Sequence, residues 1–157
     1  MDVKYVTPFL ESLIVVLDSF GIKDVKRDTI VKKNTMRVNM DITSVIGLVG
    51  GIRGNVAYSM SQETAKKIVS EMIMGLPESG TDEVIRNAIG ELANMITGKA
   101  SSIMVDTLVN TGLGFDVTPP SVIFGTDMYF IISSVQAIAV TMLTSFGNIE
   151  VNIGLEM

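Results

Sequence analysis

The sequence predicts an α+β fold in one domain over residues 1–157, in which a long central helix and an N-terminal helix pack on one face of an antiparallel-rich sheet. Apolar residues recur at helical spacing from Ile85 to Leu108, which indicates a long helix with one buried face. Alternating apolar residues and Gly-containing turns on both sides of this helix indicate hairpins. A chain of 157 residues is long enough to bury one core of this kind.

The first predicted element is an amphipathic helix that ends at Gly21, a residue type favoured just after helix C-termini. Thr7 and Pro8 are expected as its N-cap and first helical position, and the alternative places Pro8 inside the first turn. The apolar face consists of Phe9, Leu10, Leu13, Ile14, Leu17 and Phe20.

A strand and a hairpin are predicted next. Residues 35–42 alternate apolar and polar side chains, which is typical of a strand. Residues 44–49 and 52–60 predict a hairpin about Gly50-Gly51, because glycine accepts the positive φ angles of tight turns. A phosphate-binding loop at these glycines is disfavoured, since no Lys-Ser/Thr follows and no helix begins there.

Two helices follow, each with start signals. One is predicted from Ser61 to about Met74, where Gly75-Leu76-Pro77 ends it. Thr81 is the expected N-cap of the long helix, and Asp82-Glu83 suit the positive end of its dipole. The same acidic pair could form part of a metal site, but capping is the favoured interpretation.

Gly112 and Gly114 are expected to end the long helix. Gly147-Asn148 is the predicted turn between the last two strands. The strands predicted in this region are residues 121–125, residues 128–143 with a break near Ser133-Ser134, and residues 148–156.

Opposite its apolar face the long helix carries a narrow polar stripe. Residues three apart share a helix face, so the Glu91 carboxylate and the Asn94 carboxamide lie together. Gly90 and Gly98 each cost about 1 kcal/mol relative to Ala inside a helix, and close approach of another backbone is the expected reason for them. The stripe comprises Asn87, Glu91, Asn94, Gly98 and then Ser101 or Ser102.

The two halves of the chain share a pattern in which an amphipathic helix ended by Gly is followed by a hairpin. Either an internal two-fold duplication or the frequency of this common pattern accounts for it. In the duplication, Glu11 takes the place of Glu91 and Ile14 that of Asn94, so only the second half retains an amide.

Composition excludes several classes of function. The chain has no His and no Cys, which rules out the usual zinc sites and Ser-His or Cys-His catalysis. A net charge of −5 argues against nucleic acid as a partner. No apolar run reaches the roughly 18 residues of a membrane span, and no signal peptide is evident, so the expected location is the cytoplasm.

Basic residues gather between Lys23 and Arg37. Asp24 and Asp28 dilute their charge and no aromatic residues lie among them, so a solvated loop or edge strand is favoured over a site for anionic ligands.

The Glu91-x-x-Asn94 pair in its Gly-spaced frame resembles the CheX/CheC family of phosphatases, which dephosphorylate the chemotaxis response regulator CheY. Residues 45–65 resemble the strand pair and helix start of CheX proteins, and residues 116–122 resemble their post-helix segment. CheX fits better than CheC because only one intact Glu-x-x-Asn is present. Asn87 stands where the family tends to have Ser or Asp.

The resemblance implies hydrolysis of the aspartyl phosphate of a CheY-like receiver domain, with Glu91 and Asn94 as catalytic residues and Asn87 and Gly98 at the rim that contacts the partner. It implies no cofactor or metal bound by this chain, because the receiver carries its own Mg²⁺ and active-site Lys. It also implies a homodimer formed through sheet edges. The sequence itself indicates only that the apolar residues 135–143 would be prone to aggregation as an unpaired edge strand. The alternative from a different class is a non-catalytic module that binds a receiver or belongs to the motility apparatus.

Overall fold

The computed structural model describes residues 3–75, 81–107, 114–125, 128–130 and 136–156. Its helices are α1 (Val3–Ser19), α2 (Gln62–Met72) and α3 (Asp82–Thr107). Its strands are β1 (Lys26–Lys33), β2 (Met36–Val38), β3 (Ile42–Gly50), β4 (Arg53–Met60), β5 (Phe115–Val117), β6 (Ser121–Phe124), β7 (Met128–Phe130), β8 (Ala137–Thr144) and β9 (Gly147–Glu156).

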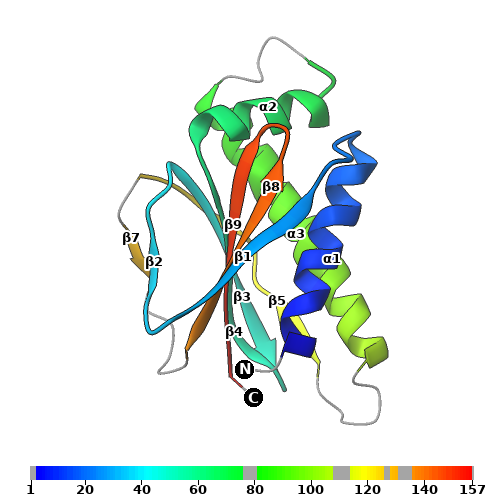
Figure 1. Ribbon diagram of the computed structural model, residues 1–157, viewed down its shortest axis with the longest axis vertical. Helices are drawn as coiled ribbons and strands as arrows, with labels where there is room; N and C mark the ends of the chain where they lie inside the picture. The colour runs from blue at the N-terminus through cyan, green and yellow to red at the C-terminus, as the bar shows by residue number, and fades with distance from the viewer. Residues whose placement is uncertain (1–2, 76–80, 108–113, 126–127, 131–135, 157) are drawn as a thin grey trace.

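Seven strands form one antiparallel sheet in the order β1-β8-β9-β4-β3-β5, with β6 also paired to β3. Figure 1 shows this sheet nearly edge on, with β1 in front, α1 and α3 on one side of it, and α2 across one end. The predicted α+β class is therefore confirmed, including the placement of the N-terminal and long helices on one sheet face.

The main core lies between the sheet and the pair α1 and α3. Alternate residues of the central strands point into it, as strand geometry requires. The largest fully buried side chains include Phe9 and Leu13 from α1, Tyr58 from β4 and Ile89 from α3. Burial on both helices fixes the face that each presents to solvent.

The other face of the sheet is partly covered by β2 and β7, which pair with each other in a separate two-stranded sheet. Val38 of β2 packs there with Ala57 and Ala137 in a small second cluster. This face also buries polar side chains, among them Thr43 and Ser59, whose hydroxyl oxygens lie 2.9 Å apart in a hydrogen bond.

Strand pairing relates the two halves of the chain in the way that a duplication predicts. The hairpins β3-β4 and β8-β9 meet at the centre of the sheet, where β4 pairs with β9. In each half a strand between the helix and the hairpin pairs with the hairpin of the other half: β1 pairs with β8, and β6 pairs with β3. The short strands β2 and β7 complete the pattern by pairing with each other.

The expected hairpin about Gly50-Gly51 is confirmed, with Leu48 opposite Gly54 at its end and a φ of 136° at Gly50. α2 also begins close to the predicted position, with Ser61 as its N-cap, since the Thr64 amide donates to Ser61 Oγ at 3.1 Å. α2 ends at Met72, shortly before the predicted end at Met74.

Pro8 does not begin α1, and it does not lie in the first turn either. The helix starts at Val3, which makes Pro8 its sixth residue. A proline there removes the amide that would bond to the carbonyl of residue 4. Burial of Val6 and Phe9 on either side outweighs this local cost.

Two predicted strands are each divided in the structure. The strand expected over residues 35–42 is interrupted at residues 39–41 between β2 and β3, where the Asp41 carboxylate accepts from the Gln62 amide at 2.9 Å. The strand expected over residues 128–143 is divided into β7 and β8, which belong to different sheets. The predicted break at Ser133-Ser134 and the predicted helix end at Gly112 lie outside the described residues.

The last hairpin turns at Ser145-Phe146, two positions earlier than expected. Gly147 is the first residue of β9, pairs with Thr144 and has a φ of 122°. The glycine is therefore used at the end of the turn rather than inside it, and the amide of Phe146 donates to Thr144 Oγ1 at 3.0 Å.

Candidate functional site

The candidate site lies on α3, which begins as the sequence predicts. The amide of Val84 donates to Thr81 Oγ1 at 3.3 Å, and Asp82 and Glu83 occupy the first turn. In the described part of the chain no group of three or more His, Cys, Asp or Glu side chains is placed to hold a metal ion. The bond to Thr81 makes this residue the N-cap of α3, and Asp82 and Glu83 lie where their charges suit the positive end of the helix dipole.

The buried face of α3 follows the predicted apolar pattern. Ile103 is only partly buried, and Leu108 lies outside the described residues. Ala93 and Met104 are additional buried residues that the pattern did not include. The predicted positions that are buried are Ile85, Ala88, Ile89, Leu92, Ile96 and Ala100.

The polar stripe lies on the outer face of α3. Asn87, Glu91 and Asn94 are exposed, and Gly98 is half-buried. Ser102 continues this exposed face, whereas Ser101 turns towards β5 and donates to the Phe115 carbonyl at 3.2 Å. The structure thus decides between the two serines that the sequence left open.

The side chains of Glu91 and Asn94 are not held by polar contacts with the rest of the described structure. Within the residues that the structure describes, the Glu91 carboxylate and the Asn94 carboxamide have no hydrogen-bond or ion-pair partner. Two polar side chains one turn apart on a rigid helix, both exposed and unpaired, are available to groups of another molecule.

Asn87 and Glu91 form a ridge between two open grooves. On one side the groove is polar, and segment 120–122 forms its far wall. On the other side the groove is largely apolar, and it is lined by Asn87 and Glu91 together with Phe20, Met72, Ile73, Val84, Ala88 and Met95. A partner that reaches Glu91 must therefore cover at least one of these grooves.

The two glycines of α3 have different surroundings, and neither has the close backbone neighbour that was expected. A Cβ at Gly90 would lie 3.4 Å from Val122 Cγ2 and 3.5 Å from Pro120 Cγ, so side chains of the 120–122 segment pack there. A Cβ at Gly98 would meet nothing within 4 Å. The absence of a side chain at Gly98 therefore leaves open space beside Asn94.

Arg86 is a residue of this region that the sequence did not single out. Its guanidinium donates to the Val122 carbonyl and lies 4.6 Å from the centroid of the Phe124 ring. It lines the polar groove with Asn87 and Glu91. Both of its contacts are with β6, so only the fold brings them together, and no local motif signals them.

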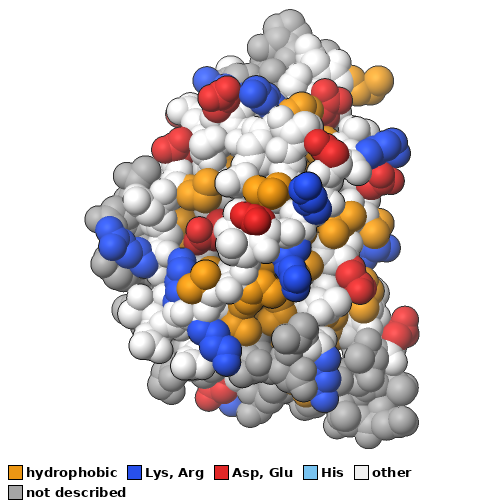
Figure 2. Space-filling model, in the orientation of Figure 1, with side chains coloured by type: hydrophobic (Ala, Val, Ile, Leu, Met, Phe, Trp, Pro, Cys, Tyr) orange, Lys and Arg blue, Asp and Glu red, His pale blue; other side chains and the backbone are white. Residues whose placement is uncertain are grey.

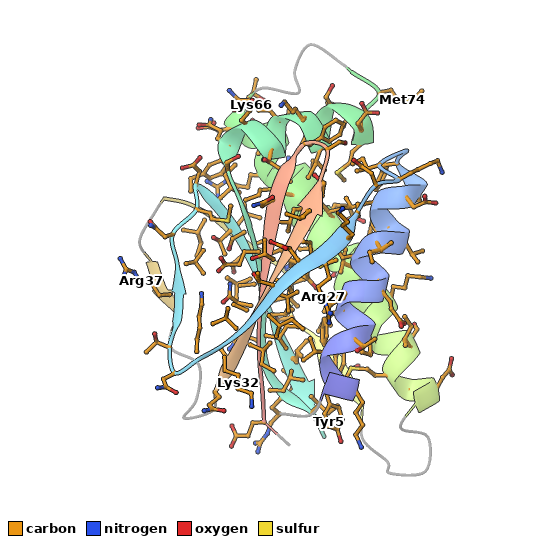
Figure 3. All side chains as sticks on the ribbon, viewed as in Figure 1. Tyr5, Arg27, Lys32, Arg37, Lys66 and Met74 are labelled. Atoms are coloured by element: carbon orange, nitrogen blue, oxygen red, sulfur yellow. The ribbon has the colours of Figure 1, made fainter. Side chains whose placement is uncertain are left out.

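The basic segment forms the exposed edge of the sheet, as one of the two sequence interpretations predicts. All residues of β1 except half-buried Lys33 are exposed, and β1 is the end strand of the sheet order. Figure 2 shows Lys and Arg side chains interleaved with Asp and Glu on this side of the molecule. Figure 3 shows Lys32 and Arg37 pointing away from the body of the fold.

Lys33 has partners within the fold. Its Nζ lies 3.3 Å from Glu150 Oε1 and 3.2 Å from the Arg37 carbonyl oxygen.

None of the helices in the described residues has the length and apolar character to cross a membrane.

The chain is similar to proteins of one known family. Residues 42–143 match the family model described as chemotaxis phosphatase CheX. The chain is 37% identical over 131 residues to the CheY-P phosphatase CheX of Thermotoga maritima, which covers 82% of this chain and 80% of that protein.

Solved structures of similar proteins have the same fold. A CheC-like superfamily protein from Shewanella sp. PV-4 superposes with a TM-score of 0.85 at 28% identity, with all of both chains covered. The structure of the CheX-CheY-BeF3-Mg²⁺ complex from Borrelia burgdorferi contains a chain with a TM-score of 0.79 at 25% identity, covering 99% of this chain and 100% of that one.

Proposed function

This chain belongs to the CheX family of chemotaxis phosphatases, and on that premise we propose that it hydrolyses the aspartyl phosphate of a CheY-like receiver domain. The observation that supports this most directly is the pair Glu91 and Asn94, exposed on one face of α3 and unpaired within the described residues. A relative of known structure is itself bound to CheY with BeF3 and Mg²⁺.

Asn94 places the attacking water. Phosphoryl transfer needs an attacking oxygen in line with the leaving oxygen, and a carboxamide can both donate to and accept from one water molecule. Asn94 needs no basicity for this task, since positioning alone lowers the barrier. A hundredfold acceleration requires only about 2.7 kcal/mol, which one aligned water can supply.

Glu91 anchors the receiver. A carboxylate beside a phosphoryl dianion is repelled unless a cation lies between them, and the active-site Lys of the receiver is the cation that the family resemblance provides. Pairing of Glu91 with that Lys fixes the register in which Asn94, one turn further along α3, reaches the phosphorus. Asn87 and Gly98 lie at the rim of the same face.

The chain supplies no metal in this scheme. Mg²⁺ belongs to the phosphorylated receiver and enters with the substrate, where it neutralises the transferring group. This chain contributes water positioning and a docking carboxylate.

The test measures phosphate release from a phosphorylated CheY-like receiver. We expect the wild-type protein to accelerate release and Asn94→Ala to return it to the spontaneous rate with binding retained. Asn148→Ala, which removes an exposed amide at the start of β9, is the matched control and should keep full activity. If the wild-type protein binds the receiver without accelerating release, the chain is a non-catalytic binding module.

Glu91 is tested by charge reversal. Glu91→Lys should abolish binding to a BeF3-activated receiver while the thermal unfolding midpoint stays near that of wild type. Glu83→Lys makes the same change of charge in the first turn of α3 and should retain binding. Unchanged affinity in Glu91→Lys would remove Glu91 from the interface.

We also propose a homodimer, formed through the β1 edge. Residues 137–143 are not an exposed edge, because β8 pairs with both β1 and β9. β1 instead ends the sheet and exposes Ile30 at 41% and Val31 at 51%. Sedimentation of wild type and Val31→Lys tests this, and a wild-type monomer at all concentrations would refute it.

A further inference from the structure

α3 is held to the sheet mainly by apolar contacts. Ile89, Leu92, Ala93 and Ile96 face β4 and β9 across a small cavity of about 10 Å³. Apolar burial is non-directional, so it holds the helix close to the sheet without fixing its rotation or its axial position. Placement of Asn94 to within a fraction of an ångström requires a directional contact as well.

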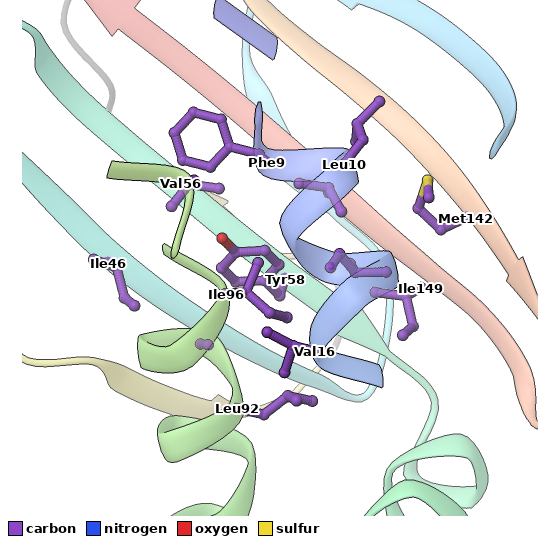
Figure 4. Close-up of a cluster of buried hydrophobic side chains, with 14 of the residues drawn as sticks. Phe9, Leu10, Val16, Ile46, Val56, Tyr58, Leu92, Ile96, Met142 and Ile149 are labelled. Atoms are coloured by element: carbon purple, nitrogen blue, oxygen red, sulfur yellow. The ribbon is translucent and has the colours of Figure 1, made fainter. Parts of the chain in front are cut away.

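Tyr58 of β4 supplies one. Its Oη lies 2.8 Å from Thr97 Oγ1, and both side chains are buried, at 2% and 0% exposure. Figure 4 shows Tyr58 beside Ile96, between the sheet and the helices. Thr97 Oγ1 in turn donates to the Ala93 carbonyl at 2.8 Å, so the Tyr58 hydroxyl is the donor to Thr97.

This chain of hydrogen bonds ends on the peptide unit that carries Asn94, because the Ala93 carbonyl and the Asn94 amide belong to the same planar group. A threonine hydroxyl bonded to the carbonyl four residues earlier also bends a helix locally. The orientation of that peptide therefore depends on where β4 holds Thr97. Glu91 lies one turn earlier and is not part of the chain.

We propose that Tyr58 is a positioning residue for Asn94, acting through Thr97 and the Ala93–Asn94 peptide. The inference rests on the proposed role of Asn94 as the residue that places water. Burial raises the pKa of the Tyr58 phenol well above its ordinary value, so the hydroxyl keeps the proton that it donates throughout the neutral range. A buried, fully satisfied contact of this kind holds its two elements in one arrangement.

Loss of the hydroxyl should affect turnover more than docking. A misplacement of about 1 Å costs about a hundredfold in rate, so we expect a shift of a fraction of that size in Tyr58→Phe to lower kcat by about threefold to tenfold. KM for the phosphorylated receiver should change by less than about twofold, because Glu91 keeps its position.

The matched control is Ser59→Ala. Ser59 is the neighbour of Tyr58 on β4, faces the opposite side of the sheet, and makes a buried side-chain hydrogen bond of 2.9 Å to Thr43. Its loss should lower the unfolding midpoint about as much as the loss of the Tyr58 hydroxyl and leave kcat unchanged. Equal losses of kcat in the two variants would show that stability alone is responsible, and would overturn the proposal.

A second pair of variants approaches the same contact from α3. Thr97→Ser keeps the hydroxyl and should retain wild-type kcat, whereas Thr97→Val removes it and should lower kcat as Tyr58→Phe does. In the double variant Tyr58→Phe with Thr97→Val the losses should not add, because both remove one contact. Full kcat in both Tyr58→Phe and Thr97→Val refutes the positioning role.

Failure of this inference differs from failure of the proposed function. If Asn94→Ala abolishes acceleration while Tyr58→Phe retains full kcat, only the role of Tyr58 is wrong. If wild type and Asn94→Ala release phosphate at the same rate, the role of Asn94 is wrong and that of Tyr58 falls with it.

Discussion

Gly98→Ala should have opposite effects on two properties of the protein: it should stabilise α3 and weaken binding of the receiver. Gly98 lies in the interior of the helix, its φ is not positive, and an added Cβ would meet nothing within 4 Å. Alanine is favoured over glycine inside a helix by about 1 kcal/mol. For a chain of this length that gain raises the thermal unfolding midpoint by roughly 2–4 °C.

The same substitution should weaken binding of the phosphorylated receiver. Gly98 lies on the face that carries Glu91 and Asn94, so its new methyl group enters the space that the receiver occupies in our proposal. We expect KM for the phosphorylated receiver to rise about tenfold, which corresponds to about 1.4 kcal/mol of lost interaction. The assays are thermal unfolding followed by circular dichroism, and phosphate release at varied receiver concentration.

Gly90→Ala is the companion variant. Its Cβ would make ordinary van der Waals contacts with Val122 and Pro120 at 3.4–3.5 Å, so the gain in helix propensity should be kept and the midpoint should rise at least as much as for Gly98→Ala. A Gly98→Ala protein that is no more stable than wild type would refute the geometric argument. One that is more stable and has an unchanged KM would show that Gly98 lies outside the interface.

Three further outcomes are expected. Ser61→Ala removes the cap of α2 and should cost about 1 kcal/mol in chemical denaturation, whereas Ser61→Asp should restore most of it. Gly54→Ala should prevent folding, because its Cβ would collide with the backbone carbonyl of Gly154 on the paired strand and its φ is 143°; a cooperative unfolding transition near that of wild type would contradict this. Burial holds the pKa of Tyr58 above the ordinary 10.0, so the unfolded chain loses the phenol proton at lower pH than the folded one. The free energy of unfolding should therefore fall as pH rises above about 10. Denaturant titrations across this range should show a weaker decline for Tyr58→Phe.

The elements that the sequence predicted well are those with local signals. Thr81 caps α3 as expected, α2 begins directly after Ser61, and the hairpin arm expected over residues 52–60 forms β4. The exposed positions of Glu91 and Asn94 also follow from helical periodicity alone.

The errors arose where distant parts of the chain decide the structure. The division of residues 128–143 depends on β7 pairing with β2 and β8 pairing with β1, and no local pattern encodes partner choice. Pro8 is accommodated inside α1 because burial of the helix face outweighs the missing amide bond. Short β5 was not predicted, and it exists because Phe115–Val117 pairs with the end of β3.

Exchange of β1 and β6 between the two hairpins makes each half of the chain depend on the other. Neither a fragment ending at Gly75 nor one beginning at Thr81 contains a complete sheet, so each alone would leave strand edges and apolar surface open to water. Co-expression of the two fragments should yield one soluble complementation product, while each expressed singly should aggregate. Ancestral fusion of two copies would then have replaced an obligatory encounter between chains with a covalent tether, leaving one copy free to lose its amide at the position of Ile14.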